Sequence, residues 1–137
     1  MSAEKTMRKR VIRALKPLHA IAVENGCGMG TPDVNLSTGA WIELKSIDSW
    51  PARPETPLRI EHFSQEQRIW LLQRCKAGGE AWLLLKVSDD WLLFDGEMAA
   101  ALVGEDEGTQ QMLKDNCNTL WEGGLDEQEL LDILREY

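Results

Sequence analysis

Three side chains that could act together in one reaction lie within residues 33–45. They are Asp33, Glu43, which is ten residues further along the chain, and Lys45, which is twelve residues further along. Residues 37–39 (Ser-Thr-Gly) have the composition of a turn, and the run after them is rich in strand-forming residues. If those three residues are a hairpin loop, facing residues have numbers that sum to 76, so Asp33 faces Glu43. Facing Cβ atoms lie about 4.5–5.5 Å apart.

Strand alternation places Lys45 on the same side as Glu43, two positions further along. Mg²⁺ prefers hard oxygen ligands and is usually held by one or two carboxylates together with water and substrate phosphate. A lysine beside such an ion can orient the attacking water and offset charge that develops on the phosphate. The segment therefore predicts a site for Mg²⁺ or Mn²⁺ with a basic partner; a surface hairpin with an ordinary Glu–Lys pair is the alternative.

The spacing Pro32-Asp33-x9-Glu43-x-Lys45 follows a glycine-rich segment and precedes a helix that carries Gln67. This pattern resembles the PD-(D/E)XK nuclease superfamily, and within it small phage-encoded endonucleases and the VRR-type and Holliday-junction-resolvase-like branches. The resemblance covers residues 1 to about 96. It implies an α/β fold, a restriction-endonuclease-like core in which a mixed sheet is flanked by helices.

The resemblance also assigns roles. Asp33 and Glu43 would be metal ligands, the backbone carbonyl of Leu44 a third ligand, and Lys45 the catalytic lysine. Glu4 of the first helix is the candidate fourth ligand, with Glu24 as its rival. Gln67 would lie near the active site, although Ser64 and Gln67 also have the spacing of a capping box. The implied activity is Mg²⁺-dependent hydrolysis of phosphodiester bonds in DNA that leaves a 5′-phosphate, on branched DNA in phage recombination or replication.

The charge is unevenly distributed along the chain. The formal net charge is −8, yet residues 1–96 hold 13 Lys and Arg against 12 Asp and Glu, whereas residues 97–137 hold 2 against 11. Phosphate contact is local, so the acidic total does not exclude DNA. We expect DNA contacts from basic residues of the first helix, the proline-rich segment and the following helix; the candidates are Arg8, Lys9, Arg10, Arg53, Arg59 and Arg68.

Composition limits the remaining possibilities. The chain has 137 residues, 43% of them hydrophobic, enough for one domain with a substantial core. No apolar run reaches membrane-spanning length, and the N-terminus does not read as a signal peptide, so we expect no membrane partner and a location in the cytoplasm of a bacterium or a phage-infected host. Three separated cysteines and two distant histidines predict neither a disulfide framework nor a zinc site.

Hydrophobic periodicity predicts the order α-β-β-β-α-β-β. A helix is expected over residues 3–16, a strand over 19–24, the hairpin over 33–45, a helix from 65 to about 77 and two strands over 81–95. In the second helix Ile69, Leu72 and one of Leu71 or Cys75 are expected to be buried. Three prolines indicate an irregular loop over 48–63, in which Trp50 either stacks on a DNA base or packs on the sheet.

We expect residues 97–137 to form an acidic helical extension packed on the same domain as the core, residues 1–96. Helices are predicted over 97–103, 109–116 and 126–135, with residues 121–124 as a connector. The extension could fold back on the basic N-terminal segment, contact a partner or form part of a homodimer, since a resolvase cuts two symmetric strands. The competing function is a non-catalytic nuclease-fold protein with an acidic partner-binding surface; a sequence-reading restriction endonuclease ranks lower.

Overall fold

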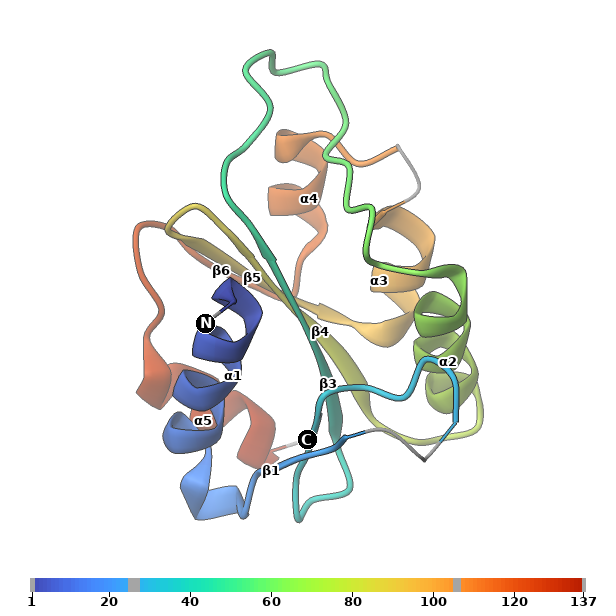
Figure 1. Ribbon diagram of the computed structural model, residues 1–137, viewed down its shortest axis with the longest axis vertical. Coiled ribbons are helices and arrows are strands. Elements are labelled where there is room, and N and C mark those ends of the chain that lie inside the picture. The colour runs from blue at the N-terminus through green and yellow to red at the C-terminus, as the bar shows by residue number, and fades with distance from the viewer. Residues whose placement is uncertain (1, 25–27, 105–106, 137) are drawn as a thin grey trace.

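A computed structural model describes residues 2–24, 28–104 and 107–136 as helices packed on one mixed sheet (Figure 1). The strands are β1 (Ile21–Ala22), β2 (Val34–Asn35), β3 (Trp41–Ile47), β4 (Ala81–Val87), β5 (Asp90–Asp95) and β6 (Thr119–Trp121). The helices are α1 (Ala3–Ala14), the 3₁₀ turn η1 (Lys16–Leu18), α2 (Gln65–Lys76), α3 (Gly96–Leu102), α4 (Gln110–Asn116) and α5 (Glu127–Glu136). The strands lie in sequence order, and of the pairs only β3 with β4 is parallel. The predicted α/β class is confirmed.

Two separate hydrophobic cores lie on the two faces of this sheet. One contains buried residues of α1 and α5 together with Ile42, Leu44, Trp82 and Leu84. The other contains buried residues of α2, α3 and α4 together with Leu83, Leu85, Val87 and Phe94. Alternate residues of the central strands thus point to opposite helical layers, as the pleat requires. In Figure 1, α1 and α5 lie to the left of the sheet, and α2, α3 and α4 to the right.

The first helix begins and ends where its sequence specifies. The Ser2 side chain caps it by accepting the Lys5 N–H at 3.1 Å. The buried residues Met7 and Val11 face the sheet, as predicted. Regular α-helix stops at Ala14, because Pro17 cannot continue it, and a 3₁₀ turn follows.

The β2–β3 hairpin has the predicted register. Val34 pairs with Ile42 and Asn35 with Trp41, both sums being 76. The Leu36 N–H donates to the Ala40 carbonyl at 2.9 Å, which closes the loop 37–39. Gly39 supplies the left-handed conformation at its end, with φ of 96°. The preceding strand is shorter than predicted, and residues 25–27 of the glycine-rich segment fall outside the described ranges.

The capping box of α2 is present. The Ser64 N–H donates to Gln67 Oε1 at 2.9 Å, and the Gln67 N–H donates to Ser64 Oγ at 3.2 Å. Leu71 is the fully buried residue of this helix. The expectation for Ile69 was wrong, because it is 41% exposed. Leu72 is only partly buried, so α2 contacts the sheet along a narrower stripe than its composition indicates.

The C-terminal region contributes a strand as well as helices. The three predicted helices are present as α3, α4 and α5, but Trp121 belongs to β6 and pairs with Trp91 of β5. The expected connector at 121–124 was therefore partly wrong. The extension does fold back on the first helix, since Arg10 Nε donates to Glu127 Oε2 at 2.7 Å.

The proline-rich loop between β3 and α2 is anchored at both ends. Leu58, Ile60 and Phe63 are buried against the α2–α3–α4 side of the sheet. Trp50 packs at the edge of the same core, and its indole N–H donates to Asp90 Oδ2 at 2.8 Å. Of the two predicted roles for Trp50, packing is thus the one observed.

No helix among the described residues is long and apolar enough to cross a membrane.

Candidate active site

Two charged side chains lie inside the sheet at positions where the neighbouring strand has leucines. The β3–β4 register sets Glu43 beside Leu83 and Lys45 beside Leu85. Glu43 is only 2% exposed and Lys45 only 3%. Burying unpaired charge costs several kcal/mol, so such residues need partners in the fold.

The partner of Glu43 on the hairpin is Asp33. One Asp33 oxygen, Oδ2, accepts the Leu44 N–H at 2.9 Å, which fixes the carboxylate at the start of β2. Burial, followed by the negative charge of Asp33, raises the pKa of Glu43 to about 9. Lys45 acts in the opposite direction but is outweighed. Without a bound cation, Glu43 is therefore protonated at neutral pH and hydrogen-bonded to Asp33.

Lys45 is held by the hairpin strand and the proline-rich loop together. Its Nζ lies 3.4 Å from Glu43 Oε2 and donates to the backbone carbonyl of His62 at 2.7 Å. The same nitrogen stands 5.9 Å from the centre of the Phe63 ring. The ammonium is thus oriented toward the paired carboxyls by a loop for which the sequence predicted DNA contacts or packing on the sheet, but no contact with Lys45.

Glu4 comes to the same end of the sheet but is already engaged. Its Oε2 accepts the Ser46 N–H at 3.2 Å and also contacts His62 Nε2. His62 was read as a structural residue, and nothing in its local sequence reveals that it joins the loop to α1. The rival, Glu24, instead pairs with Arg8 at 3.9 Å and its side chain is 76% exposed.

Glu4, Asp33 and the Leu44 carbonyl have the oxygen donors that a hard divalent cation prefers, and Glu43 is not among the residues that line the cavity there. A cavity of about 170 Å³ is lined by Glu4, Asp33 and Leu44, together with Ser2, Lys5 and Arg8. A cation there would favour the ionised forms of the carboxyls that otherwise share a proton. As the side chains stand, the described part of the chain has no group of three or more His, Cys, Asp or Glu arranged to hold a metal. The ligand roles of Asp33, Glu43, Leu44 and Glu4 stay predictions.

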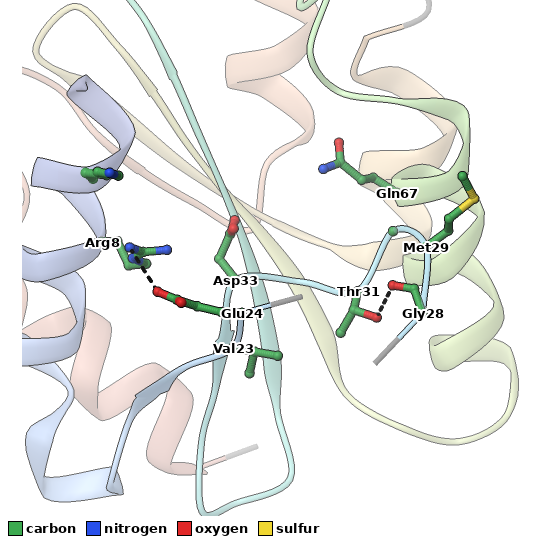
Figure 2. A pocket seen from close by; sticks show the side chains of 10 residues that line it. Arg8, Val23, Glu24, Gly28, Met29, Thr31, Asp33 and Gln67 are labelled. Carbon is green, nitrogen blue, oxygen red and sulfur yellow. Dashed lines mark hydrogen bonds and ion pairs between the residues drawn. The ribbon is translucent and has the colours of Figure 1, made fainter. Parts of the chain in front are cut away.

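A larger hollow of about 700 Å³ opens beside this cavity, and Asp33, Lys5 and Arg8 line both. Figure 2 shows Asp33 between Arg8 of α1 and Gln67 of α2, with residues 28–31 along one wall. Because Gln67 Oε1 is used in the capping box, its amide nitrogen is the atom left to face the hollow. This hollow can therefore take an anion next to Asp33.

The glycine-rich turn packs directly on the first turn of α2. A Cβ on Gly30 would lie 2.5 Å from the Glu66 carbonyl oxygen, and its φ is +79°. Only glycine permits both that approach and that conformation. The turn thus closes one side of the hollow against the start of α2.

The predicted DNA-binding residues do not all lie on one surface. Arg8 lines the cavities at Asp33, whereas Lys9 lines a third cavity further along α1. Arg10 faces α5 and stacks 5.3 Å from the centre of the Trp91 ring. The others, Arg53, Arg59 and Arg68, are not among the residues that line the hollow at Asp33. Lys5 does line it, and the sequence singled it out only as part of a basic segment.

The chain was compared with family models, curated proteins and solved structures. No protein-family model matches the chain, and no curated protein matches it. Among solved structures, it is similar to Hjc from the archaeal hyperthermophile Archaeoglobus fulgidus, a Holliday junction resolvase. The two are 25% identical over 71% of this chain and 75% of that chain, with a TM-score of 0.47. At this TM-score the two folds superpose only loosely.

Proposed function

We propose that this protein is a metal-dependent endonuclease that hydrolyses phosphodiester bonds in DNA. The observation that carries the proposal is the buried Glu43–Lys45 pair beside Asp33, in a sheet whose equivalent neighbours are leucines. Burying two ionisable side chains in an apolar sheet adds little to stability, because desolvation offsets the attraction between them. Asp33 lines the open hollow, Glu43 is hydrogen-bonded to Asp33, and Lys45 contacts Glu43. Such a cluster is better explained as reaction machinery.

Asp33 and Glu43 would hold Mg²⁺ or Mn²⁺, with the Leu44 carbonyl and Glu4 as further ligands. For Glu4 to join them, its oxygen must leave the Ser46 N–H and His62. When bound, the ion supplies Lewis-acid polarisation of the phosphate and lowers the pKa of a coordinated water.

The chain's own residues then perform three tasks. Lys45, fixed by the His62 carbonyl, orients the attacking water and offsets the charge that builds on the phosphate. Lys5 and Arg8 bind non-bridging phosphate oxygens in the hollow, and the Gln67 amide nitrogen donates from the opposite wall. The water oxygen forms a bond to phosphorus, the bond to the 3′ oxygen breaks, and that oxygen takes up a proton. The product end carries a 5′-phosphate.

Branched DNA, such as a four-way junction, is the substrate we propose. Support comes from the resemblance of the Asp33, Glu43 and Lys45 motif to resolvase-like nucleases and from the hollow of about 700 Å³ at Asp33, where Lys5 and Arg8 can contact phosphate. Symmetric cutting of a junction calls for two active sites, so we propose a homodimer. Roles in phage recombination or replication, and a cytoplasmic location, remain predictions of the sequence.

Cleavage of three DNA substrates tests the function. A labelled four-way junction, a linear duplex of the same sequence and a supercoiled plasmid are incubated with Mg²⁺, Mn²⁺ or EDTA. We expect metal-dependent cleavage that Lys45→Met abolishes. Lys86→Met is the matched control, because Lys86 lies on the adjacent strand and one position further along, on the opposite face. Symmetric cuts confined to the junction support a resolvase, whereas equal cutting of all three removes the junction claim.

Absence of cleavage with both metals, in a folded protein, would contradict the proposal. The non-catalytic alternative would then gain support from the acidic exposed residues of α5, which offer a surface for a basic partner. A pull-down alone would not decide between the two, because a nuclease can also have partners. Loss of cleavage in Lys45→Met with the control unchanged is the decisive result.

A further inference from the structure

The outer side of α1 carries basic residues along its whole length. Lys5 and Arg8 line the cavities at Asp33, and Lys9, Arg13 and Lys16 line a third cavity of about 430 Å³ at the other end of the helix. Steps of three and four residues place side chains on one side of a helix. The two ends are therefore joined by one continuous row of cations.

The third cavity contains no acidic residue in its lining. Its remaining members are Ile12, His19 and Ala20, so it is a shallow groove with an apolar floor and a basic rim. Lys9, Arg13 and Lys16 are all exposed, and their side chains make no ion pair or hydrogen bond with another described residue. The positive charge of this groove is therefore complementary to a polyanion.

The opposite flank of the same helix is neutralised. Arg10 donates to Glu127 and lies over Trp91, which turns it toward α5. Glu4, the acidic residue of α1, is held by Ser46 and His62.

Within the basic row, Arg8 pairs with Glu24 at 3.9 Å, but that partner is largely exposed and such surface pairs are weak. A phosphate can displace Glu24 from Arg8 at little cost.

We propose that one nucleic-acid strand runs from the site at Asp33 along the outer side of α1, its phosphates bound in turn by Lys5 and Arg8 and then by Lys9, Arg13 and Lys16. This inference rests on the proposed function, since it gives the substrate a direction through the same site. A 12-residue helix is about 18 Å long, which matches about five nucleotides of a B-form strand. The path reaches the groove without involving the proline-rich loop.

Salt dependence of binding tests the path. Binding of a labelled four-way junction is measured in EDTA, which prevents cleavage, over a series of salt concentrations. The groove variant is Lys9→Gln/Arg13→Gln/Lys16→Gln. The control, Lys76→Gln/Lys86→Gln/Arg135→Gln, removes the same charge from other surfaces. We expect the slope of log K against log salt to become less negative by about 2–3 in the groove variant, because each lost phosphate contact contributes about 0.9.

The control should keep the wild-type slope to within about one phosphate contact. In Mg²⁺ the groove variant should raise KM about tenfold or more while kcat and the cut positions stay unchanged, because the reacting groups are untouched. Thermal melting shows whether either variant is less stable; these side chains are on the surface, so both should melt as the wild type does.

The outcomes separate this inference from the proposed function. If the wild type cleaves and the groove variant binds and cleaves like it, the path is wrong and the nuclease stands. If no substrate is cleaved but the slope of log K against log salt becomes less negative only in the groove variant, the path is supported and the proposed nuclease activity is contradicted. Equal slopes in both variants, or no binding by the wild type, overturn the path. So does loss of binding to phosphatidylserine vesicles in the groove variant with DNA binding unchanged, which would assign the groove to a membrane surface.

Discussion

β3 and β4 are parallel neighbours at the centre of the same sheet, yet their facing residues differ in chemical type. At two facing positions β4 has Leu83 and Leu85, both 0% exposed, where β3 has Glu43 and Lys45, which are 2% and 3% exposed. The facing side chains are thus buried to nearly the same extent, but those of β4 are apolar and those of β3 are ionisable. Leucine there stabilises the fold by removing apolar surface from water, whereas burying the ionisable Glu43 and Lys45 costs desolvation that their attraction only partly offsets. β4 thus stabilises the domain, whereas in the proposed function β3 carries the reacting groups.

The largest expected effect is on catalysis, at Lys45. Lys45→Met keeps the volume and apolar stem but removes the ammonium, so the strand becomes more like β4. We expect cleavage to fall by about 10²–10⁴-fold, in line with loss of a positioned catalytic group. We also expect the free energy of unfolding to fall, by up to about 3–5 kcal/mol, because the buried carboxyls and the His62 carbonyl lose their cationic partner. Cleavage rate and urea unfolding of the same preparation measure both. A cleavage rate for Lys45→Met within tenfold of the wild-type rate would show that Lys45 is not a catalytic residue.

The converse substitution is in β4. Leu85→Ala leaves a cavity in the core and should lower the free energy of unfolding by about 2–5 kcal/mol. The charged pair is untouched, so we expect the rate constant for cleavage to change little at temperatures where the variant is folded. Urea unfolding, with cleavage measured well below the midpoint, checks this. A loss of stability below about 1 kcal/mol would show that β4 is not the structural strand.

Glu43 links the comparison to pH. Its pKa of about 9 in the folded protein is above the ordinary value of 4.5, so the folded state binds more protons in this interval. Stability in EDTA is therefore greatest below about pH 4.5 as far as Glu43 is concerned, and it declines as the pH rises toward 9. Glu43→Gln cannot ionise and should be more stable than the wild type at pH 8, by on the order of 1–3 kcal/mol.

Urea unfolding at pH 5, 7 and 9 measures this difference, with Glu80→Gln as a control at a carboxylate on a different part of the fold. Addition of Mg²⁺ should narrow the gap at pH 8, because the ion stabilises only the ionised wild type. Parallel stability profiles for wild type and Glu43→Gln would mean that Glu43 is ionised in the folded protein without a metal.

The smallest effect expected is at the anchor of the loop that holds Lys45. Trp50→Phe removes the 2.8 Å hydrogen bond to Asp90 and should cost about 0.5–1.5 kcal/mol. Asp90 keeps its other partners, the Gly123 N–H and Lys114, so the loop should stay in place. A cleavage loss larger than about tenfold would show that the anchor positions Lys45 through His62.

Much of the site follows from short-range sequence rules. Turn composition and strand alternation fix the register that brings Asp33 to Glu43, and the capping box fixes the start of α2 at Ser64. Both involve residues within about ten positions of each other, where backbone geometry leaves few alternatives. The resemblance to PD-(D/E)XK nucleases then supplies roles that spacing alone does not.

What the sequence could not give are contacts between distant segments. His62 meets Glu4 across 58 positions, and Arg10 meets Glu127 across 117. The strand β6 has three residues and becomes a strand because β5 offers it an edge, so its own periodicity is too short to detect. Ile69 looked buried because it is apolar, but the helix rotates Leu71 inward instead.

The hairpin and the parallel pair also differ in how soon they can form. Asn35 and Trp41 are six residues apart, so β2 and β3 can pair within microseconds, whereas Trp41 must find Ala81 across forty residues. Asp33 and Glu43 thus meet while still in water, and they lose that water only when β4 arrives. Ionised carboxyls resist that step, so stopped-flow refolding of the wild type in EDTA should slow as the pH rises, and that of Glu43→Gln should not. The two carboxylates that would bind a metal therefore slow the packing of β4 until a proton or a cation neutralises them.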